Sequence, residues 1–172
     1  MYKKTFSNIS IKSNRYIEKS FEKSLEIIRK EKKKCVLING PISKKTFLCL
    51  GLDTDIDKIP NHLLNSQDPV FDFNKSLVDR LSSKIVAVKI NTAFYESRGK
   101  DGWSSLEKSI DYIKSNHPDL FTIADAKRGD IGNTSKMYAK AFFENLNFDS
   151  ITLSPYMGMD TVSEFMDYDE KY

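Results

Sequence analysis

Four short apolar runs, at residues 47–50, 85–88, 121–124 and 151–153, constrain the fold of this chain more than any other feature of its sequence. Continuous apolar runs of this length are typical of β-strands that are buried on both faces. The second run, Ile85-Val86-Ala87-Val88, is rich in β-branched residues, which favour strands. The sequence therefore predicts four buried strands that begin near residues 47, 85, 121 and 150.

Apolar residues with helical spacing lie between and after these runs. The stripes are Phe73, Leu77 and Leu81; Leu106, Ile110 and Ile113; Met137, Ala141 and Phe142; and Val162, Phe165 and Met166. Ser104 with Glu107, and Thr161 with Glu164, have the spacing of a capping box. These two pairs predict helices that begin at Ser104 and at Thr161, the latter with its three apolar residues facing inward.

Strands and helices thus alternate, at roughly 30–40 residues per unit. Such alternation predicts βαβ crossovers, a parallel sheet and an α/β fold. Two architectures satisfy it, an open doubly wound sheet and a (β/α)8 barrel. A barrel takes eight strands and typically about 250 residues. Four strands therefore predict either a small open sheet or about half of a barrel.

The charge balance changes near residue 45. Residues 1–46 contain 13 Lys and Arg and 4 Glu, which gives +9, and residues 47–172 contain 14 Lys and Arg and 20 Asp and Glu, which gives −6; the sum is the stated +3. We interpret residues 1–45 as a basic, partly helical N-terminal extension and residues 46–172 as the α/β domain. The predicted helix of the extension carries Ile17, Phe21, Leu25 and Ile28.

The lysines between residues 30 and 34 could contact nucleic acid or an organelle import machine. A solvated helix end explains them better, because no aromatic residues interleave with the lysines and four glutamates interrupt the positive charge. We therefore expect no nucleic-acid partner. No apolar run approaches the roughly 20 residues of a membrane helix. The first 12 residues also lack the apolar core of a secretory signal. These features predict a cytoplasmic protein without a membrane partner. Cys35 and Cys49 form no CxxC motif and have no histidine at ligand spacing, which favours reduced, structural thiols over a metal or redox pair.

Charged residues gather where the third predicted strand ends. Asp125 and Lys127 are two residues apart, so their side chains should project to the same side. Gly129 permits a turn that could bring Asp130 back toward them. Two carboxylates beside an ammonium would keep it charged and able to donate a proton. A surface salt-bridge cluster is the alternative interpretation.

The two preceding predicted strands also end in polar groups. Asp53 follows the first strand, and Lys89 and Asn91 follow the second. The carboxyl ends of parallel strands are where such folds place their active sites. Unpaired buried charges are expensive in a plain core, whereas charges paired around a ligand are not. The joint pattern therefore predicts a ligand site at this edge of the sheet.

These residues and their surroundings resemble orotidine 5′-phosphate decarboxylases of the bacterial and apicomplexan branch. The resemblance is carried by Asp53, by Lys89 and by the segments FLCLGLDTDIDKIP, NTAFYESRG, DAKRGDIGNT and SPYMG. It runs from about residue 45 to the end of the chain, whereas the first 44 residues match no pattern of this family. Ile90 stands where this branch often has proline.

The resemblance implies a (β/α)8 barrel that forms a homodimer, uses no metal and no organic cofactor, and converts orotidine 5′-monophosphate to uridine 5′-monophosphate. Asp53 and Lys89 would hold the ribose hydroxyls, with Asn91 nearby. Asp125 and Lys127 would face the carboxylate and C6 of the pyrimidine. The resemblance also implies that the following turn serves the neighbouring subunit, with residues Asp130, Ile131 and Thr134.

The family's later strands carry an arginine and a glutamine that grip the phosphate, and neither is present in these 172 residues. We therefore expect a chain that is inactive, or nearly so, by itself. Two alternatives stay open. One is a non-enzymatic fragment or a split half that needs a partner chain. The other is a sugar-phosphate decarboxylase or synthase of the same barrel group, which would require a metal.

Overall fold

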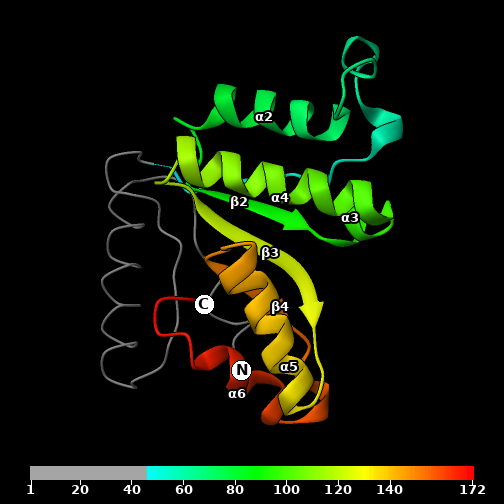
Figure 1. The fold of residues 1–172 in the computed structure, drawn as a ribbon. Helices are drawn as coiled ribbons and strands as arrows, with labels where there is room; N and C mark the ends of the chain where they lie inside the picture. Colours follow the sequence, from blue (N-terminus) through cyan, green and yellow to red (C-terminus); the bar gives the residue numbers. More distant parts are fainter. Residues whose placement is uncertain (1–45) are drawn as a thin grey trace, which may run out of the picture. The chain divides into compact units, whose positions relative to one another are not determined.

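The computed structural model describes residues 46–172, which form a parallel sheet with helices packed against it (Figure 1). The strands are β1 (Cys49–Gly51), β2 (Ala87–Asn91), β3 (Phe121–Arg128) and β4 (Ser150–Leu153). Every neighbouring pair is parallel, and the order in the sheet is β1-β2-β3-β4. The predicted α/β class and the four predicted strands are confirmed. The boundary near residue 45, the helix of the basic extension and Cys35 lie outside the described residues.

Helices and helical turns connect the strands. They are η1 (Ile56–Lys58), η2 (Asn61–Leu63), α2 (Pro69–Leu81), α3 (Ala93–Glu96), α4 (Gly99–Asn116), α5 (Gly132–Ala139), the π-helical turn η3 (Lys140–Asn145), η4 (Pro155–Met157) and α6 (Asp160–Met166). Asp68 caps α2, because its carboxylate accepts the backbone N–H of Phe71 at 3.1 Å. None of the helices in residues 46–172 has the length and apolar character needed to cross a bilayer.

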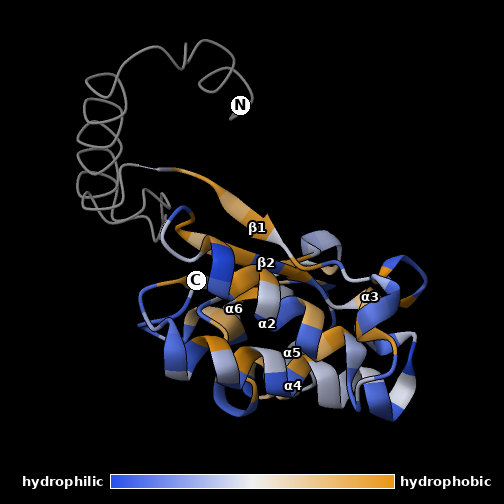
Figure 2. Cartoon of the chain, turned by 90° about the horizontal axis from the view of Figure 1, so that it is seen from above, coloured by the Kyte–Doolittle hydropathy of each residue, from blue (hydrophilic) through white to orange (hydrophobic). Residues whose placement is uncertain are grey.

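The strand order follows the chain order, as it does around a barrel. A doubly wound sheet instead reverses its order at a switch point between two strands. Viewed from above, α2 and α4 lie on one side of β1 and β2, and their outward surfaces are mostly hydrophilic (Figure 2). The sequential order with helices on this side is the arrangement of successive β/α units of a barrel.

The core lies between the strands and these helices. Val88 and Ile90 of β2 and Ala124 of β3 are buried and belong to one apolar cluster with Val78 of α2 and Ile110 of α4. Burying each of the larger aliphatic side chains contributes about 1.5–3 kcal/mol. The same strands turn their alternate residues, Lys89 among them, away from this core.

The first strand departs from its prediction, because it is not buried on both faces. Phe47 and Leu48 are 52% and 53% exposed, and Cys49, a free thiol, is exposed as well. The reason is position: β1 pairs only with β2 among the described strands, so it is an edge strand.

Both predicted capping boxes are wrong. Helix α4 begins at Gly99, five residues before Ser104, because its first turn packs against α3: a Cβ on Gly102 would lie 1.8 Å from the carbonyl oxygen of Tyr95. Helix α6 begins at Asp160, so Thr161 lies inside the helix, is fully buried and caps no backbone group.

Two methionines that were predicted to face inward are exposed. Met137 lies midway between the buried residues Ser135 and Ala139 of α5 and therefore faces the opposite side of the helix. Met166 is exposed while its neighbour Phe165 supplies the buried contact of α6.

Candidate active site

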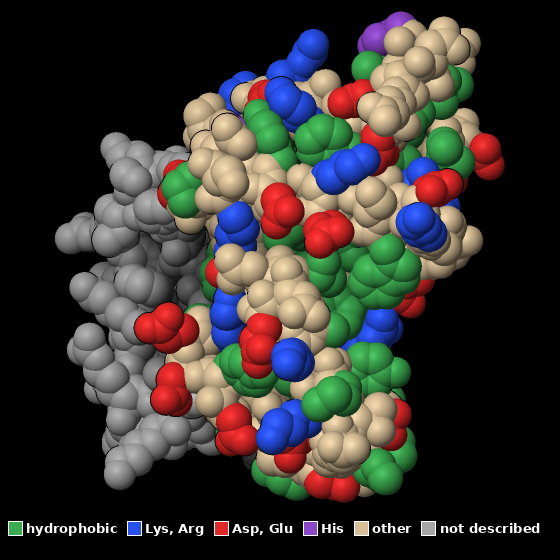
Figure 3. Space-filling view, in the orientation of Figure 1, with side chains coloured by type: hydrophobic (Ala, Val, Ile, Leu, Met, Phe, Trp, Pro, Cys, Tyr) green, Lys and Arg blue, Asp and Glu red, His purple; other side chains and the backbone are tan. Residues whose placement is uncertain are grey.

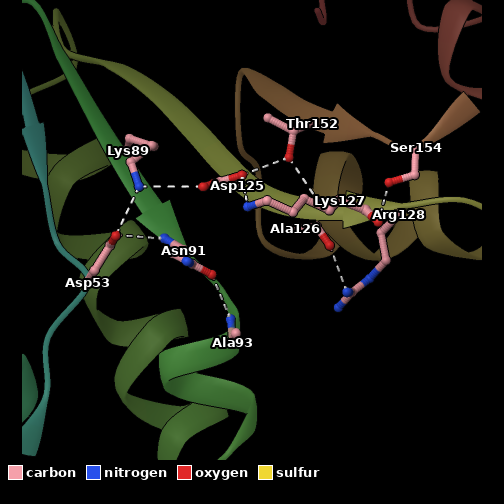
Figure 4. Close-up of polar contacts among 10 residues, drawn as sticks. All are labelled: Asp53, Lys89, Asn91, Ala93, Asp125, Ala126, Lys127, Arg128, Thr152 and Ser154. Atoms are coloured by element: carbon pink, nitrogen blue, oxygen red, sulfur yellow. Dashed lines mark hydrogen bonds and ion pairs between the residues drawn. The ribbon is translucent and has the colours of Figure 1, made fainter.

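Four charged side chains of alternating sign form a continuous row at the carboxyl edge of the sheet (Figure 4). The Lys89 ammonium lies 3.0 Å from Asp53 Oδ2 and 3.4 Å from Asp125 Oδ2. The Lys127 ammonium lies 2.6 Å from Asp125 Oδ1. The row therefore runs Asp53, Lys89, Asp125, Lys127, and each of the two central groups touches two partners of opposite charge.

The register of the sheet brings these residues together. Asn91 of β2 stands opposite Asp125 of β3, and Lys89 of β2 stands opposite Gly51 of β1, two residues before Asp53. Because side chains alternate along a strand, Lys89 and Asn91 share one face, and Asp125 points to that same face. Four residues that the sequence singled out thus meet in space, although they span 75 positions from 53 to 127 of the chain.

Asn91 contributes mainly through its backbone and its position. Its N–H donates to Asp53 Oδ1 at 3.1 Å, which fixes the carboxylate against the end of β2. Its side-chain oxygen accepts the N–H of Ala93 at 3.2 Å and so orders the start of α3. The Asn91 amide therefore lies beside the charged row without pairing to its lysines.

The charges of the row reinforce one another. Burial is the largest influence on Lys89 and works against its charge, but the hydrogen bond and charge of Asp53, together with the charge of Asp125, outweigh it and raise the pKa of Lys89. The hydrogen bond from Lys127 is the largest influence on Asp125 and lowers the pKa of its carboxyl. Both central groups are therefore charged at neutral pH. The Lys127 side chain is 62% exposed, which leaves its ammonium free to meet a ligand.

The turn after β3 does not join this row within one chain. Asp130 Oδ1 accepts the N–H of Ile131 at 2.8 Å, and within residues 46–172 Lys127 pairs with Asp125 alone. Within one chain the Asp130 carboxylate thus binds its own backbone and makes no ion pair with the row, and its part in a site stays a prediction. Ile131 is 56% exposed and Thr134 is half-buried at the start of α5.

Two hydroxyls of β4 and its end belong to the site and were missed from the sequence. Thr152 donates to Asp125 Oδ1 at 3.0 Å and accepts the backbone N–H of Lys127 at 3.0 Å. Ser154 donates to the backbone carbonyl of Lys127 at 3.2 Å. The rule that identified the first three strand ends would have found Ser154, which directly follows the fourth strand.

Arg128 is the last residue of β3 and ties the strand to the helices; Figure 4 shows its side chain folded back to the carbonyl of Ala126. Its guanidinium donates to the carbonyl of Ala126 at 2.9 Å, pairs with Glu96 of α3, and lies 5.3 Å from the ring centroid of Tyr138 of α5. The residue next to Lys127 is therefore anchored at three points.

A buried polar network supports the other end of the row. Tyr95 of α3 donates its hydroxyl to the carbonyl of Leu52 at 2.8 Å, and Asn74 of α2 donates to the Tyr95 hydroxyl at 2.8 Å. Thr54 donates to the Asn74 side-chain oxygen at 2.5 Å. Leu52 and Thr54 flank Asp53, so this network fixes the backbone on both sides of that carboxylate. Within residues 46–172 no three His, Cys, Asp or Glu side chains are grouped so that they could hold a metal ion.

The sequence is similar to one family throughout the described part. The model of the orotidine 5′-phosphate decarboxylase / HUMPS family matches residues 46–172. The orotidine 5′-phosphate decarboxylase of Flavobacterium johnsoniae is 60% identical over 131 residues, which cover 76% of this chain and 48% of the relative. The enzyme of the same name from Bacteroides fragilis is 60% identical over 129 residues, which cover 75% and 47%. The chain spans about half the length of the curated relatives it matches.

Solved structures show the same likeness. The OMP decarboxylase of Leishmania donovani superposes with a TM-score of 0.61 at 34% identity, over 73% of this chain and 46% of that one. The orotidine 5′-monophosphate decarboxylase of Plasmodium berghei gives a TM-score of 0.61 at 27% identity, over 74% and 54%. These neighbours are (β/α)8 barrels, so the four parallel strands correspond to part of such a barrel.

Proposed function

The chain belongs to the orotidine 5′-phosphate decarboxylase / HUMPS family, and we propose on this basis that it serves the decarboxylation of orotidine 5′-monophosphate to uridine 5′-monophosphate in pyrimidine biosynthesis. The observation that carries the proposal is the row Asp53, Lys89, Asp125, Lys127 at the ends of three consecutive parallel strands. The names of the curated relatives favour this reaction over the sugar-phosphate reactions of the same barrel group.

The row divides into a part for the ribose and a part for the base. Asp53 and Lys89 hold the ribose hydroxyls, with Asn91 beside them; a carboxylate that accepts and an ammonium that donates are complementary to a pair of hydroxyls. Asp125 and Lys127 face the carboxylate and C6 of the pyrimidine. The exposure of the Lys127 side chain supports its placement against the substrate.

The chemistry follows from the charge of Lys127. When the bond between C6 and the carboxylate breaks, CO2 leaves and the electron pair stays on C6. The ammonium of Lys127 stabilises that developing charge and then transfers one proton to C6, which leaves a neutral amine. Two unit charges about 4 Å apart interact by roughly 4 kcal/mol at an effective dielectric constant near 20, which corresponds to about a thousandfold in rate.

Asp125 would add repulsion against the substrate carboxylate, and this repulsion is relieved as CO2 departs. Its hydrogen bonds from Lys127 and Thr152 support this role, because they hold the charged carboxylate in place before substrate arrives. The reaction so described uses no metal and no organic cofactor.

The protein forms a homodimer, in which a second copy of the same fold completes each site. In such a homodimer Asp130 and Thr134 serve the neighbouring subunit's site, and Ile131 packs on the base there. The exposure of Ile131 supports this arrangement, as do the exposed apolar side chains of Tyr156, Met157 and Met159. Apolar side chains reach the surface at the end of the molecule where α5 begins and η4 and α6 lie (Figure 3). We place the protein in the cytoplasm, without nucleic-acid or membrane partners.

The proposal is tested by substituting Lys127→Ala and measuring release of CO2 from carboxyl-labelled orotidine 5′-monophosphate. Two formats are compared: the chain itself, and a chimera in which residues 46–172 replace the matching segment of the Flavobacterium johnsoniae enzyme. We expect an active chimera and little or no turnover by the chain alone, because the relatives are about twice as long as the matched segment. Lys127→Ala should abolish turnover and leave the unfolding free energy within about 1 kcal/mol, since the Lys127 side chain is 62% exposed and Asp125 keeps its bonds to Lys89 and Thr152.

Lys75→Ala is the matched control, because Lys75 of α2 also pairs with an aspartate, at 2.7 Å from Asp79, and has no bond to any residue of the row. It should retain full turnover. Decarboxylation by the Lys127→Ala chimera at the unsubstituted rate would refute the role of Lys127. Turnover that is lost on chelation and restored by magnesium would instead favour a sugar-phosphate enzyme of the same barrel group.

A further inference from the structure

The backbone of Lys127 adopts a conformation that side chains rarely accept. Its φ angle is +48°, in the left-handed region, and among the described non-glycine residues only Asn147 shares this property. The residue lies where the ladder between β3 and β4 shifts its register, between Ala124 and Arg128. A left-handed residue without glycine's freedom persists only where its surroundings hold it, and such residues cluster at functional sites.

Hydroxyls from the neighbouring strand hold both peptide groups of Lys127. The N–H donates to Thr152 Oγ1 at 3.0 Å, and the carbonyl accepts from Ser154 Oγ at 3.2 Å. The regular ladder is interrupted at this point, so these side chains replace the backbone partners that a continuous strand pair would supply.

Thr152 also fixes the partner of the Lys127 ammonium. Its single proton is donated to Asp125 Oδ1 at 3.0 Å, and the same oxygen accepts the Lys127 ammonium at 2.6 Å. The Thr152 hydroxyl thus accepts a hydrogen bond from the backbone N–H of Lys127 and donates one to the Asp125 carboxylate. The same carboxylate binds the Lys127 ammonium (Figure 4).

We propose that Thr152 is a positioning residue of this site: it sets the backbone of Lys127 and the plane of the Asp125 carboxylate, and through them the place of the ammonium. The proposal rests on the proposed function, in which Lys127 delivers the proton to C6. In this role Thr152 acts on the reaction through Lys127 and Asp125, the two residues to which its hydroxyl binds.

A comparable hydroxyl elsewhere in the sheet gives a matched control. Thr122 of β3 donates to Asp149 Oδ2 at 2.9 Å and accepts the backbone N–H of Asp149 at 3.1 Å. It therefore makes the same pair of bonds as Thr152, to a carboxylate and to a backbone N–H, but near the amino end of its strand; its carboxylate partner Asp149 pairs with Lys114 and not with Lys89 or Lys127. Thr122→Val and Thr152→Val remove the same group by the same substitution.

The first measurement reads the conformation of Lys127 in the full chain by solution NMR, from its 13Cα shift and its three-bond N–H to Hα coupling. The unsubstituted chain and Thr152→Ser should show left-handed values, because serine keeps the hydroxyl. Thr152→Val should lose them, and Thr122→Val should keep them even where it lowers stability.

The second measurement is decarboxylation in the chimera. Thr152→Val should lower kcat by about 10- to 100-fold, the effect of losing a hydrogen bond to a charged group, and change KM by less than about threefold. Thr152→Ser should restore kcat to within about threefold of the unsubstituted protein, and Thr122→Val should leave kcat unchanged.

The two measurements separate failure of this inference from failure of the proposed function. A Thr152→Val protein with left-handed Lys127 and unsubstituted kcat overturns the positioning role. A chimera without decarboxylase activity overturns the proposed function, and the NMR comparison then decides the positioning of Lys127 alone. A loss in kcat that Thr122→Val shares equally also overturns the proposal, because it shows a general effect of the lost hydroxyl on the sheet.

Discussion

Removing the hydroxyl of Tyr95 should destabilise the protein far more than its size suggests. Tyr95 is fully buried, and its hydroxyl donates to the carbonyl of Leu52 and accepts from the Asn74 amide, both at 2.8 Å. Burial raises the pKa of Tyr95 to about 12, so the hydroxyl is protonated throughout the neutral range. Tyr95→Phe keeps the ring and removes only this group.

The magnitude follows from the two groups left without partners. The Leu52 carbonyl and one N–H of the Asn74 amide stay buried, and each unsatisfied buried polar group costs about 1–3 kcal/mol. The small space left by the oxygen adds little. We expect Tyr95→Phe to lower the free energy of unfolding by about 2–6 kcal/mol, the sum for the two groups. With a urea dependence of about 2 kcal/mol per M, the midpoint should fall by more than about 1 M.

Urea unfolding at neutral pH checks this value, followed by far-ultraviolet circular dichroism and by the fluorescence of Trp103, the single tryptophan of the chain. Tyr112→Phe is the matched control, because its hydroxyl donates at 2.6 Å to Asp79 on an exposed surface. That variant should lose less than about 1 kcal/mol. If Tyr95→Phe loses no more than Tyr112→Phe, the buried hydrogen bonds beside Asp53 do not stabilise the fold more than an exposed one does, and the reasoning is refuted.

Two further substitutions test the packing and the charges. Gly129→Ala should lower the unfolding free energy by about 1–3 kcal/mol, because its Cβ would lie 2.4 Å from the carbonyl oxygen of Ser154. Gly51→Ala is the control and should have little effect, because no atom lies within 4 Å of its Cβ. Equal losses in the two variants would contradict this prediction. Burial opposes the charge of Asp79, but the hydrogen bond from Lys75 and two others lower its pKa to about 2. Asp79 therefore stabilises the fold above about pH 4, and this contribution is lost as the pH falls toward 2. The contribution is about 1 kcal/mol, because the Asp79 side chain is 36% exposed and water screens its charge. The difference between the unfolding free energies of Asp79→Asn and the unsubstituted protein should shrink between pH 6 and pH 2.5, and a constant difference would refute the assignment.

Local patterns in the sequence were sufficient for the sheet and for the charged row. The apolar runs predict the strands. Because side chains alternate along a strand, Asp125 and Lys127, which are two residues apart, share one side at the end of their strand. Parallel pairing of the strands then suffices to bring them close to Asp53 and Lys89. The likeness to known enzymes then identified the sheet as part of a barrel.

Features that depend on tertiary contacts were not predictable in this way. Nothing in the sequence of β4 shows that Thr152 would meet the backbone of Lys127, because that contact requires a left-handed residue and a shift of register. The start of α4 at Gly99 depends on how closely its first turn approaches α3. The Asp130 carboxylate binds the nearest backbone N–H instead of the more distant Lys127, and a tight turn alone does not decide between them.

The anchoring of Arg128 has a consequence for how this protein could be altered. The guanidinium is held by Glu96 of α3 and by the ring of Tyr138 of α5, neither of which belongs to the charged row. We expect a substitution at either position to loosen the hold on Arg128, and with it on the peptide that follows Lys127. Under the proposed function, Glu96 and Tyr138 are two positions away from the charged row at which a substitution would act on Lys127, while every group proposed to face the substrate keeps its identity.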